Sequence, residues 1–145
     1  MASPSITSVN SIYMLAITGL YTVPQQLQGF SADDIFDTGE INSAEVVMGL
    51  DGKIAAGYVP VAIVQNITLL ANSDSNALFE AWWASQRAAQ ELYFATGIIR
   101  MPSVKRSYAL TNGVLTGYSP MSDAKKTLQP RKYTITWESA LAAPL

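Results

Sequence analysis

The chain has 145 residues, a length typical of one domain with its own hydrophobic core. It contains neither cysteine nor histidine, which excludes disulfides, thiol nucleophiles, cysteine-bound zinc and the commonest general base of enzymes. Charged residues make up only 14% of the chain, against about 25% in typical soluble domains. A surface this poor in charge is either covered by uncharged polar side chains or buried against other copies.

The charges are unevenly distributed, although the net charge is only −2. Residues 1–52 contain acidic residues and no lysine or arginine. In residues 100–132, by contrast, every charged residue except Asp123 is a lysine or an arginine. Two interpretations stay open: the two regions neutralise each other within one fold, or an acidic surface of one copy meets a basic surface of the next. A nucleic-acid-binding domain is not favoured, because it would be basic overall.

The first third of the chain predicts a buried strand followed by a long loop. Residues 12–22 form a continuous apolar run rich in β-branched and aromatic side chains. Residues 24–41 are polar and acidic but still contain large apolar side chains. Because loops of this length in small domains are usually functional, we expect an extended loop that leaves the body and docks on another molecule.

Two dipeptides predict β-hairpins. Asp51-Gly52 lies between the predicted strands 44–50 and 53–59, and Asn112-Gly113 lies between 104–111 and 114–118. A further strand is predicted over residues 61–70 from its alternating pattern.

One helix is predicted at about residues 75–94, and its polar face is narrow. At 100° per residue, Leu78, Phe79, Trp82 and Trp83 share a broad, bulky face, and small alanines cover another side. Since a helix on the surface of a monomer should be polar over about half its circumference, we expect packing on two sides, with Trp82 in the core and Trp83 at an interface.

The last strand is predicted at residues 132–138, where Tyr133, Ile135 and Trp137 alternate with polar residues. Residues 139–145 show no period and are expected to hang free or to cross to a neighbour. The predicted fold is mainly β (α+β): a small antiparallel β-barrel or sandwich with one flanking helix. We expect a single domain over residues 1–145, with an extended loop at about 24–41 and a C-terminal tail at about 139–145.

The order of these elements resembles the tail tube proteins of tailed bacteriophages, which are related in fold to the tube protein of type VI secretion. The phrases that carry the resemblance are Leu27-Gln28-Gly29-Phe30, Asp33-Asp34, Glu45-Val46-Val47-Met48-Gly49-Leu50-Asp51-Gly52-Lys53, Ala56-Gly57-Tyr58-Val59-Pro60, Thr111-Asn112-Gly113-Val114-Leu115 and Lys132-Tyr133-Thr134-Ile135-Thr136-Trp137-Glu138. The resemblance rests on the order and spacing of these phrases, which together span nearly the whole chain.

The resemblance implies a structural subunit that forms hexameric rings, stacked into a hollow conduit for DNA ejection. The implied location is the virion tail, made in the host cytoplasm, with further copies as the main partner. A sheath, baseplate or initiator, terminator and tape measure protein are other implied partners, and DNA passes without specific binding. No catalytic residue, cofactor or metal is implied. No membrane span is expected, because the apolar run 12–23 is too short.

The resemblance also implies that a long early loop reaches the adjacent ring. Together with the helix and the charge pattern, it selects residues expected to contact other copies: Leu27, Phe30, Asp33, Asp34, Ile35, Phe36, Trp83, Ala84, Arg87, Lys125 and Lys126. A bore that passes DNA should be lined by acids, because lysine and arginine would retain phosphates.

The alternative function is a monomeric β-barrel that binds a small ligand or an oligonucleotide. Its candidate residues are Tyr108, Tyr118 and Tyr133 with Arg106, Arg131 and Lys132, since such sites combine stacking aromatic rings with basic side chains. An enzyme is not expected, because the sequence offers no coherent acid–base set.

Overall fold

The structure is a computed structural model, and it describes residues 9–31 and 35–145. In these ranges the chain forms strands and one α-helix, followed here in chain order: β1 (Ile12–Ile17), β2 (Tyr21–Gln26), β3 (Phe36–Thr38), β4 (Ala44–Met48), β5 (Ile54–Tyr58), β6 (Ile63–Leu69), α1 (Asn76–Ala89), β7 (Ala95–Met101), the short 3₁₀ helix η1 (Pro102–Val104), β8 (Arg106–Tyr118) and β9 (Arg131–Pro144).

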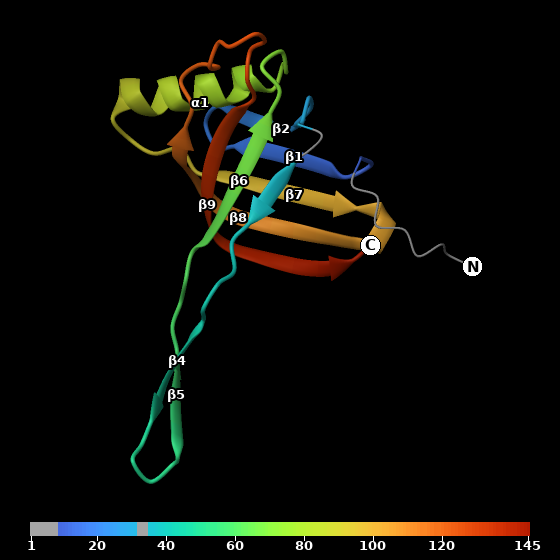
Figure 1. Ribbon diagram of the computed structural model, residues 1–145. Coiled ribbons are helices and arrows are strands. Elements are labelled where there is room, and N and C mark those ends of the chain that lie inside the picture. The colour runs from blue at the N-terminus through green and yellow to red at the C-terminus, as the bar shows by residue number, and fades with distance from the viewer. Residues whose placement is uncertain (1–8, 32–34) are drawn as a thin grey trace, which may run out of the picture.

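Seven strands form one curved antiparallel sheet in the order β2-β1-β7-β8-β9-β6-β3. The sheet wraps around the core, and α1 lies across one end (Figure 1). The mainly β fold with one flanking helix is therefore confirmed. Within the described residues the barrel is not closed by paired strands, because β2 and β3 are the outer strands. The segment after β2 bridges the two edges: the Leu27 amide donates to Tyr13 (2.8 Å), and the Leu70 amide donates to Gly29 (2.7 Å).

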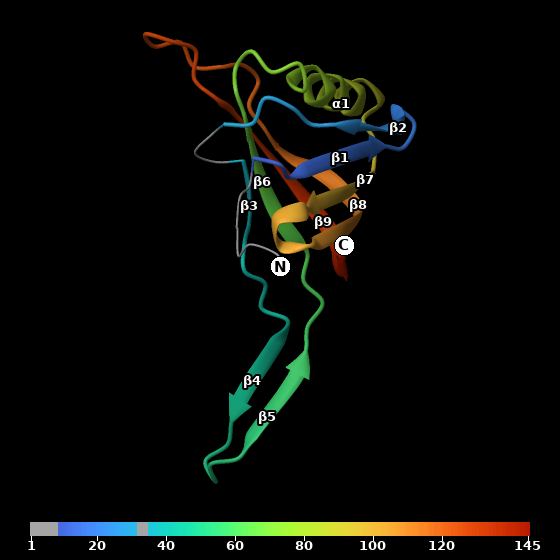
Figure 2. The same ribbon diagram turned by 90° about the vertical axis from the view of Figure 1, so that its right-hand side faces the viewer.

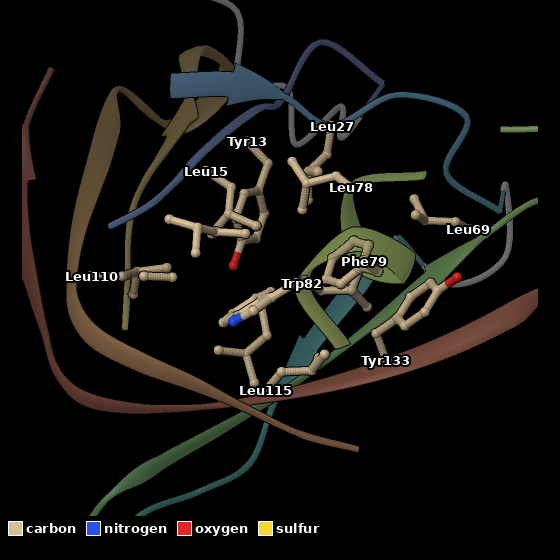
Figure 3. Close-up of a cluster of buried hydrophobic side chains, with 14 of the residues drawn as sticks. Tyr13, Leu15, Leu27, Leu69, Leu78, Phe79, Trp82, Leu110, Leu115 and Tyr133 are labelled. Atoms are coloured by element: carbon tan, nitrogen blue, oxygen red, sulfur yellow. The ribbon is translucent and has the colours of Figure 1, made fainter. Parts of the chain in front are cut away.

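The core lies between the concave side of the sheet and α1. Tyr133, Ile135 and Trp137 of β9 are fully buried, as their alternation predicts. Phe79 and Trp82 point from α1 into the same cluster (Figure 3), and the ring of Phe79 stacks on Tyr133 at 4.1 Å. The bulky face of the helix thus closes one end of the sheet, and the predicted core position of Trp82 is confirmed.

Buried polar groups in this core are paired. The hydroxyl of Tyr13 donates to Gln65 Oε1 at 2.5 Å, and Trp137 Nε1 donates to the same oxygen at 3.2 Å. The hydroxyl of Tyr133 donates to Asn76 Oδ1 at 2.8 Å. Burial raises the pKa of Tyr13 and of Tyr133, because a phenolate in the core would lose its hydration; the Arg131 guanidinium opposes this only in part at Tyr133.

These two tyrosines predict a loss of stability at alkaline pH. Above pH ~10 the unfolded tyrosines ionise while the folded ones stay protonated, so the unfolded state binds fewer protons and the free energy of unfolding falls as the pH rises. Two such groups contribute a slope of about 2.7 kcal/mol per pH unit. Urea unfolding between pH 8 and 11.5 measures it, and Tyr13→Phe should reduce the slope by about half. An unchanged slope in this variant would contradict the assignment.

The helix is shorter than predicted. It ends at Ala89, and Gln90 adopts a left-handed conformation (φ 54°). Residues 90–94 turn back across the helix, where Trp82 Nε1 donates to the carbonyl of Tyr93 at 3.0 Å. The next strand, β7, then begins at Ala95.

The predicted hairpin at Asn112-Gly113 is wrong, because β8 runs through both residues. The register between β7 and β8 shifts opposite this dipeptide, and Asn112 has a positive φ of 48°. The dipeptide therefore marks an irregularity within a long strand.

The predicted tail and the predicted extended loop also differ from the structure. Residues 139–144 continue β9 and pair with β8; Ser139 and Ala140 are half-buried, and residues 141–144 are exposed on both faces, which leaves no alternation in the sequence there. Within residues 24–41, residues 24–26 end β2 and residues 36–38 form β3, and Leu27, Phe30 and Phe36 pack on the core.

Candidate interaction surfaces

A β-hairpin, here called the arm (residues 40–62), projects from the end of the sheet opposite α1 (Figures 1 and 2). Its strands β4 and β5 form a sheet of their own, separate from the seven-stranded one. The turn is the predicted one: Gly52 has a φ of 82°, and the Gly49 amide donates to the Lys53 carbonyl at 2.8 Å. At about 3.3 Å per residue, each side of the arm reaches up to roughly 35 Å from the body.

Every residue of the arm is exposed, yet the arm carries many large apolar side chains. The pairs Val46↔Ala56 and Met48↔Ile54 place apolar side chains together on one face. Leu50 at the tip is fully exposed, with a relative exposure of 111%. An isolated two-stranded hairpin is at best marginally stable in water, and contiguous apolar surface of this kind marks contacts between proteins.

At the α1 end, the connection between β8 and β9 forms a second projecting feature, here called the lysine loop (residues 119–130). The buried Arg131 anchors its base: Nη1 donates to Glu80 Oε1 at 2.6 Å, and Nη2 donates to the Ser119 carbonyl at 2.8 Å. Burial by itself lowers the pKa of Arg131, but the Glu80 carboxylate and the hydroxyls of Tyr118 and Tyr133 outweigh it and raise that pKa. The anchoring cation is therefore permanently charged.

The lysine loop is ordered by its own backbone. The Gln129 amide donates to the Asp123 carbonyl at 2.9 Å, and Ala124 forms an isolated bridge with Leu128. The loop presents the exposed side chains of Met121, Leu128, Lys125 and Lys126. It is thus a preformed projection with both apolar and basic groups.

A third feature is an apolar cavity of about 430 Å³ at the end of the sheet from which the arm leaves, here called the open-end pocket. Six parts of the chain line it: β3, the arm base and β6 on one side, and β7, β8 and β9 from Trp137 onward on the other. Its lining includes Phe36, Ile41, Met101, Tyr108 and Ala142. No single stretch of sequence could indicate this pocket, because long-range strand pairing assembles it.

The structure separates the predicted contact residues into two groups. Leu27 is only 3% exposed and belongs to the core, so its predicted role as a contact between copies is corrected. Ile35 is half-buried, and Phe30 and Phe36 pack edge to face at 6.4 Å, within the same copy. These side chains fasten the β2–β3 connection to the sheet. Asp33 and Asp34 lie outside the described residues.

The remaining predicted residues lie on the surface at the α1 end. Trp83 is half-buried and stacks on Tyr118 at 5.0 Å, with the Arg87 guanidinium 5.3 Å from the Trp83 ring centroid. Ala84 and Arg87 are exposed, as are Lys125 and Lys126. The sequence analysis did not single out the arm as exposed apolar surface, although consecutive apolar residues beside Asp51-Gly52 were a usable signal.

Two of the six residues proposed for a ligand-binding module are buried and unavailable for stacking. Tyr133 is fully buried and Arg131 is 5% exposed and paired with Glu80. Among the described residues, no three carboxylates are grouped so that they could hold a metal ion. Nor is any helix in that part of the chain both long and apolar enough to cross a membrane.

The sequence matches the protein family described as tail fiber protein gp32 over residues 4–141. The chain belongs to this family. No curated protein matches the sequence. Family membership places the chain among tail proteins.

Solved structures of contractile injection systems share the fold. A chain in the anti-feeding prophage tube-terminating cap is 14% identical with a TM-score of 0.62, over 100% of this chain and 95% of that one. A chain in the sheath/tube terminator of the PVC extracellular contractile injection system is 9% identical with a TM-score of 0.67, over 99% of both. One in the PVC sheath–tube complex is 13% identical with a TM-score of 0.56, over 92% of this chain and 88% of that one. The tail tube-like character predicted from the sequence is confirmed.

Proposed function

We propose that the chain is a non-enzymatic structural subunit of a tail tube, whose copies form hexameric rings that stack into a hollow conduit for DNA. The observation that carries this proposal is the arm: a long hairpin exposed on both faces, with apolar side chains from Val46 to Tyr58. Such a surface needs a protein partner. In an assembled particle made of many copies of this chain, a second copy is always available as that partner.

The arm favours a repeated assembly over a single pairwise contact. Burying five large apolar side chains of the arm contributes roughly 8–15 kcal/mol, and association itself costs about 4–15 kcal/mol in lost freedom. One arm contact is therefore weak. A ring or stack, in which each copy gives and receives several contacts, turns weak contacts into a stable particle.

The charge distribution supports head-to-tail stacking. The arm carries Glu40, Glu45 and Asp51 against Lys53, whereas the lysine loop at the opposite end carries Lys125 and Lys126 against Asp123. Opposite net charges on the arm and on the lysine loop, which project from opposite ends, suit a heterologous contact, in which one end of a copy meets the other end of the next.

The finer parts of the proposal follow from the resemblance and the shared fold. The fold occurs in solved complexes that include a tube, a sheath, a baseplate and a terminator, which supports partners of these classes in a virion tail. We expect acidic side chains to line the bore, so that DNA passes without being retained. Arg131 is already removed from any bore by its burial against Glu80; finding Lys125 or Lys126 in the lumen would contradict the expectation.

Light scattering with size exclusion, followed by negative-stain imaging, tests the proposed function. The purified chain should form rings or rods as its concentration rises, and high salt should weaken them because the end charges are exposed. A compact monomer at all concentrations would contradict the proposal and favour the monomeric ligand-binding module.

A further inference from the structure

The open-end pocket accepts only an apolar occupant, because its polar lining is already paired internally. Gln65 Oε1 accepts from Tyr13 and Trp137, and Gln65 Nε2 donates to Thr38 Oγ1 at 3.4 Å. A polar ligand would find no unpaired buried partner here, since the described residues contain no buried side-chain nitrogen or oxygen without a hydrogen bond. An apolar side chain, by contrast, would cover the exposed lining and lose nothing.

The rim of this pocket is charged on both sides. Glu40 lies between the lining residues Gly39 and Ile41 and is exposed, whereas Asp37 points to the other face of β3, where Asn66 Nδ2 donates to its Oδ1 at 2.9 Å. Across the pocket, the exposed Arg106 is the register partner of the lining residue Met101 and lies on the same face, whereas Arg100 alternates with the lining residues Ile99 and Met101 and points to the other face. The pocket thus combines an apolar floor with an acidic and a basic side.

The lysine loop has the complementary chemistry and lies at the other end of the same chain. Met121 and Leu128 are 74% and 62% exposed, beside Lys125 and Lys126 and the single acid Asp123. Figure 2 shows the loop at the end of the body opposite the arm, projecting to the upper left, to the side of α1. Its backbone hydrogen bonds and the Arg131 anchor hold it in shape, so docking costs little ordering entropy.

We propose that the open-end pocket of one copy receives the lysine loop of a second copy, with Met121 and Leu128 on the apolar floor. Lys125 and Lys126 then face Glu40, while Asp123 faces Arg106. This inference rests on the proposed function, because the α1 end of each copy faces the arm end of the next only when the copies stack head to tail.

Disulfide trapping tests the contact directly, since the natural chain contains no cysteine. Met121→Cys and Ala142→Cys change exposed positions on the loop and at the pocket. When the two variants, one carrying a size tag, are mixed under assembly conditions, copper–phenanthroline should oxidise the two thiols to one disulfide between different chains. Such a bond requires Cα atoms within about 7 Å. Met121→Cys mixed with Val23→Cys, exposed on β2, is the matched control and should give only background.

A charge reversal adds a second readout. Lys125→Glu with Lys126→Glu in the loop variant should lower the yield of disulfide roughly tenfold at low salt, and Glu40→Lys in the pocket variant should restore part of it. Rings or rods that form normally, yet give no disulfide above the Val23→Cys control, would overturn the loop–pocket contact and leave the proposed function standing. Trapping of Ala142→Cys by Leu50→Cys instead would assign the pocket to the arm tip. A chain that never assembles would overturn both proposals.

Discussion

Replacing residues 45–57 of the arm by Asn-Gly should abolish assembly while leaving the fold of the monomer intact. The shortened hairpin closes directly after the pair Ala44↔Tyr58, and Asn-Gly supplies the turn conformation that a two-residue loop requires. The deleted residues are exposed on both faces, so their removal uncovers no core. We expect the melting temperature to stay within about 3 °C, because surface changes of this kind cost little stability. Association should weaken by at least about 100-fold, the effect of losing a hot spot of 2.7 kcal/mol or more.

Sedimentation velocity measures the assembly of the shortened chain, and circular dichroism measures its melting. A matched variant, Met48→Ser with Ile54→Ser, keeps the full length of the arm and removes one apolar cross-strand pair. If apolar contacts carry the assembly, this variant loses a large part of the association as well. If length alone matters, it assembles normally. Particles of unchanged size and stability from the shortened chain would contradict the role of the arm.

The sequence predicts those features of this fold that depend on neighbouring residues. Alternation in residues 132–138 places Tyr133 and Trp137 in the core, and the 3.6-residue period of the helix does the same for Trp82. Asp51-Gly52 predicts the turn of the arm, because the positive φ of Gly52 is a local requirement. Each of these features depends on residues that lie within a few positions of one another in the sequence.

Which segment projects from the body is decided by contacts that are not local. Residues 24–41 and residues 44–58 both mix apolar and polar side chains, and composition does not tell which segment returns to the body. Long-range pairing decides it: the Leu70 amide donates to Gly29, and Leu27 then enters the core. The arm has no such partner strand in the seven-stranded sheet, so its apolar residues stay exposed.

The candidate surfaces divide in the same way. Ala84, Arg87, Lys125 and Lys126 lie on the surface as expected from a helix face and a charged loop. The open-end pocket could not be predicted, since strands separated by more than one hundred residues contribute its walls. The end of β9, residues 139–144, could not be predicted as a strand. Backbone hydrogen bonds to β8 hold it, and these bonds form whatever the side chains are, so they leave no pattern in the sequence.

Gly113→Ala should destabilise the fold by about 3 kcal/mol, because Gly113 leaves the space that Trp137 fills. A Cβ at this position would lie 2.5 Å from two atoms of the Trp137 ring, and the ring cannot retreat, since Gly97 faces it from β7 and the side chain is fully buried. The φ of Gly113 is not in the left-handed region, so the cost is steric. The dipeptide that resembles a hairpin turn therefore serves the packing of one tryptophan.

A double-mutant cycle separates this cause from a general loss of strand stability. Trp137→Ala alone should cost about 3–5 kcal/mol, and in that background Gly113→Ala should cost less than about 1 kcal/mol, because the added methyl group then enters free space. Urea unfolding gives all four free energies, and Gly57→Ala in the arm, where no atom lies within 4 Å of the added Cβ, is the control with an effect of about zero. Equal costs of Gly113→Ala in the two backgrounds would show that Trp137 is not the reason for the glycine. Trp137 also lines the open-end pocket. If Gly113→Ala lowers the free energy of unfolding only when Trp137 is present, Gly113 fixes the position of the Trp137 ring and therefore the shape of that pocket.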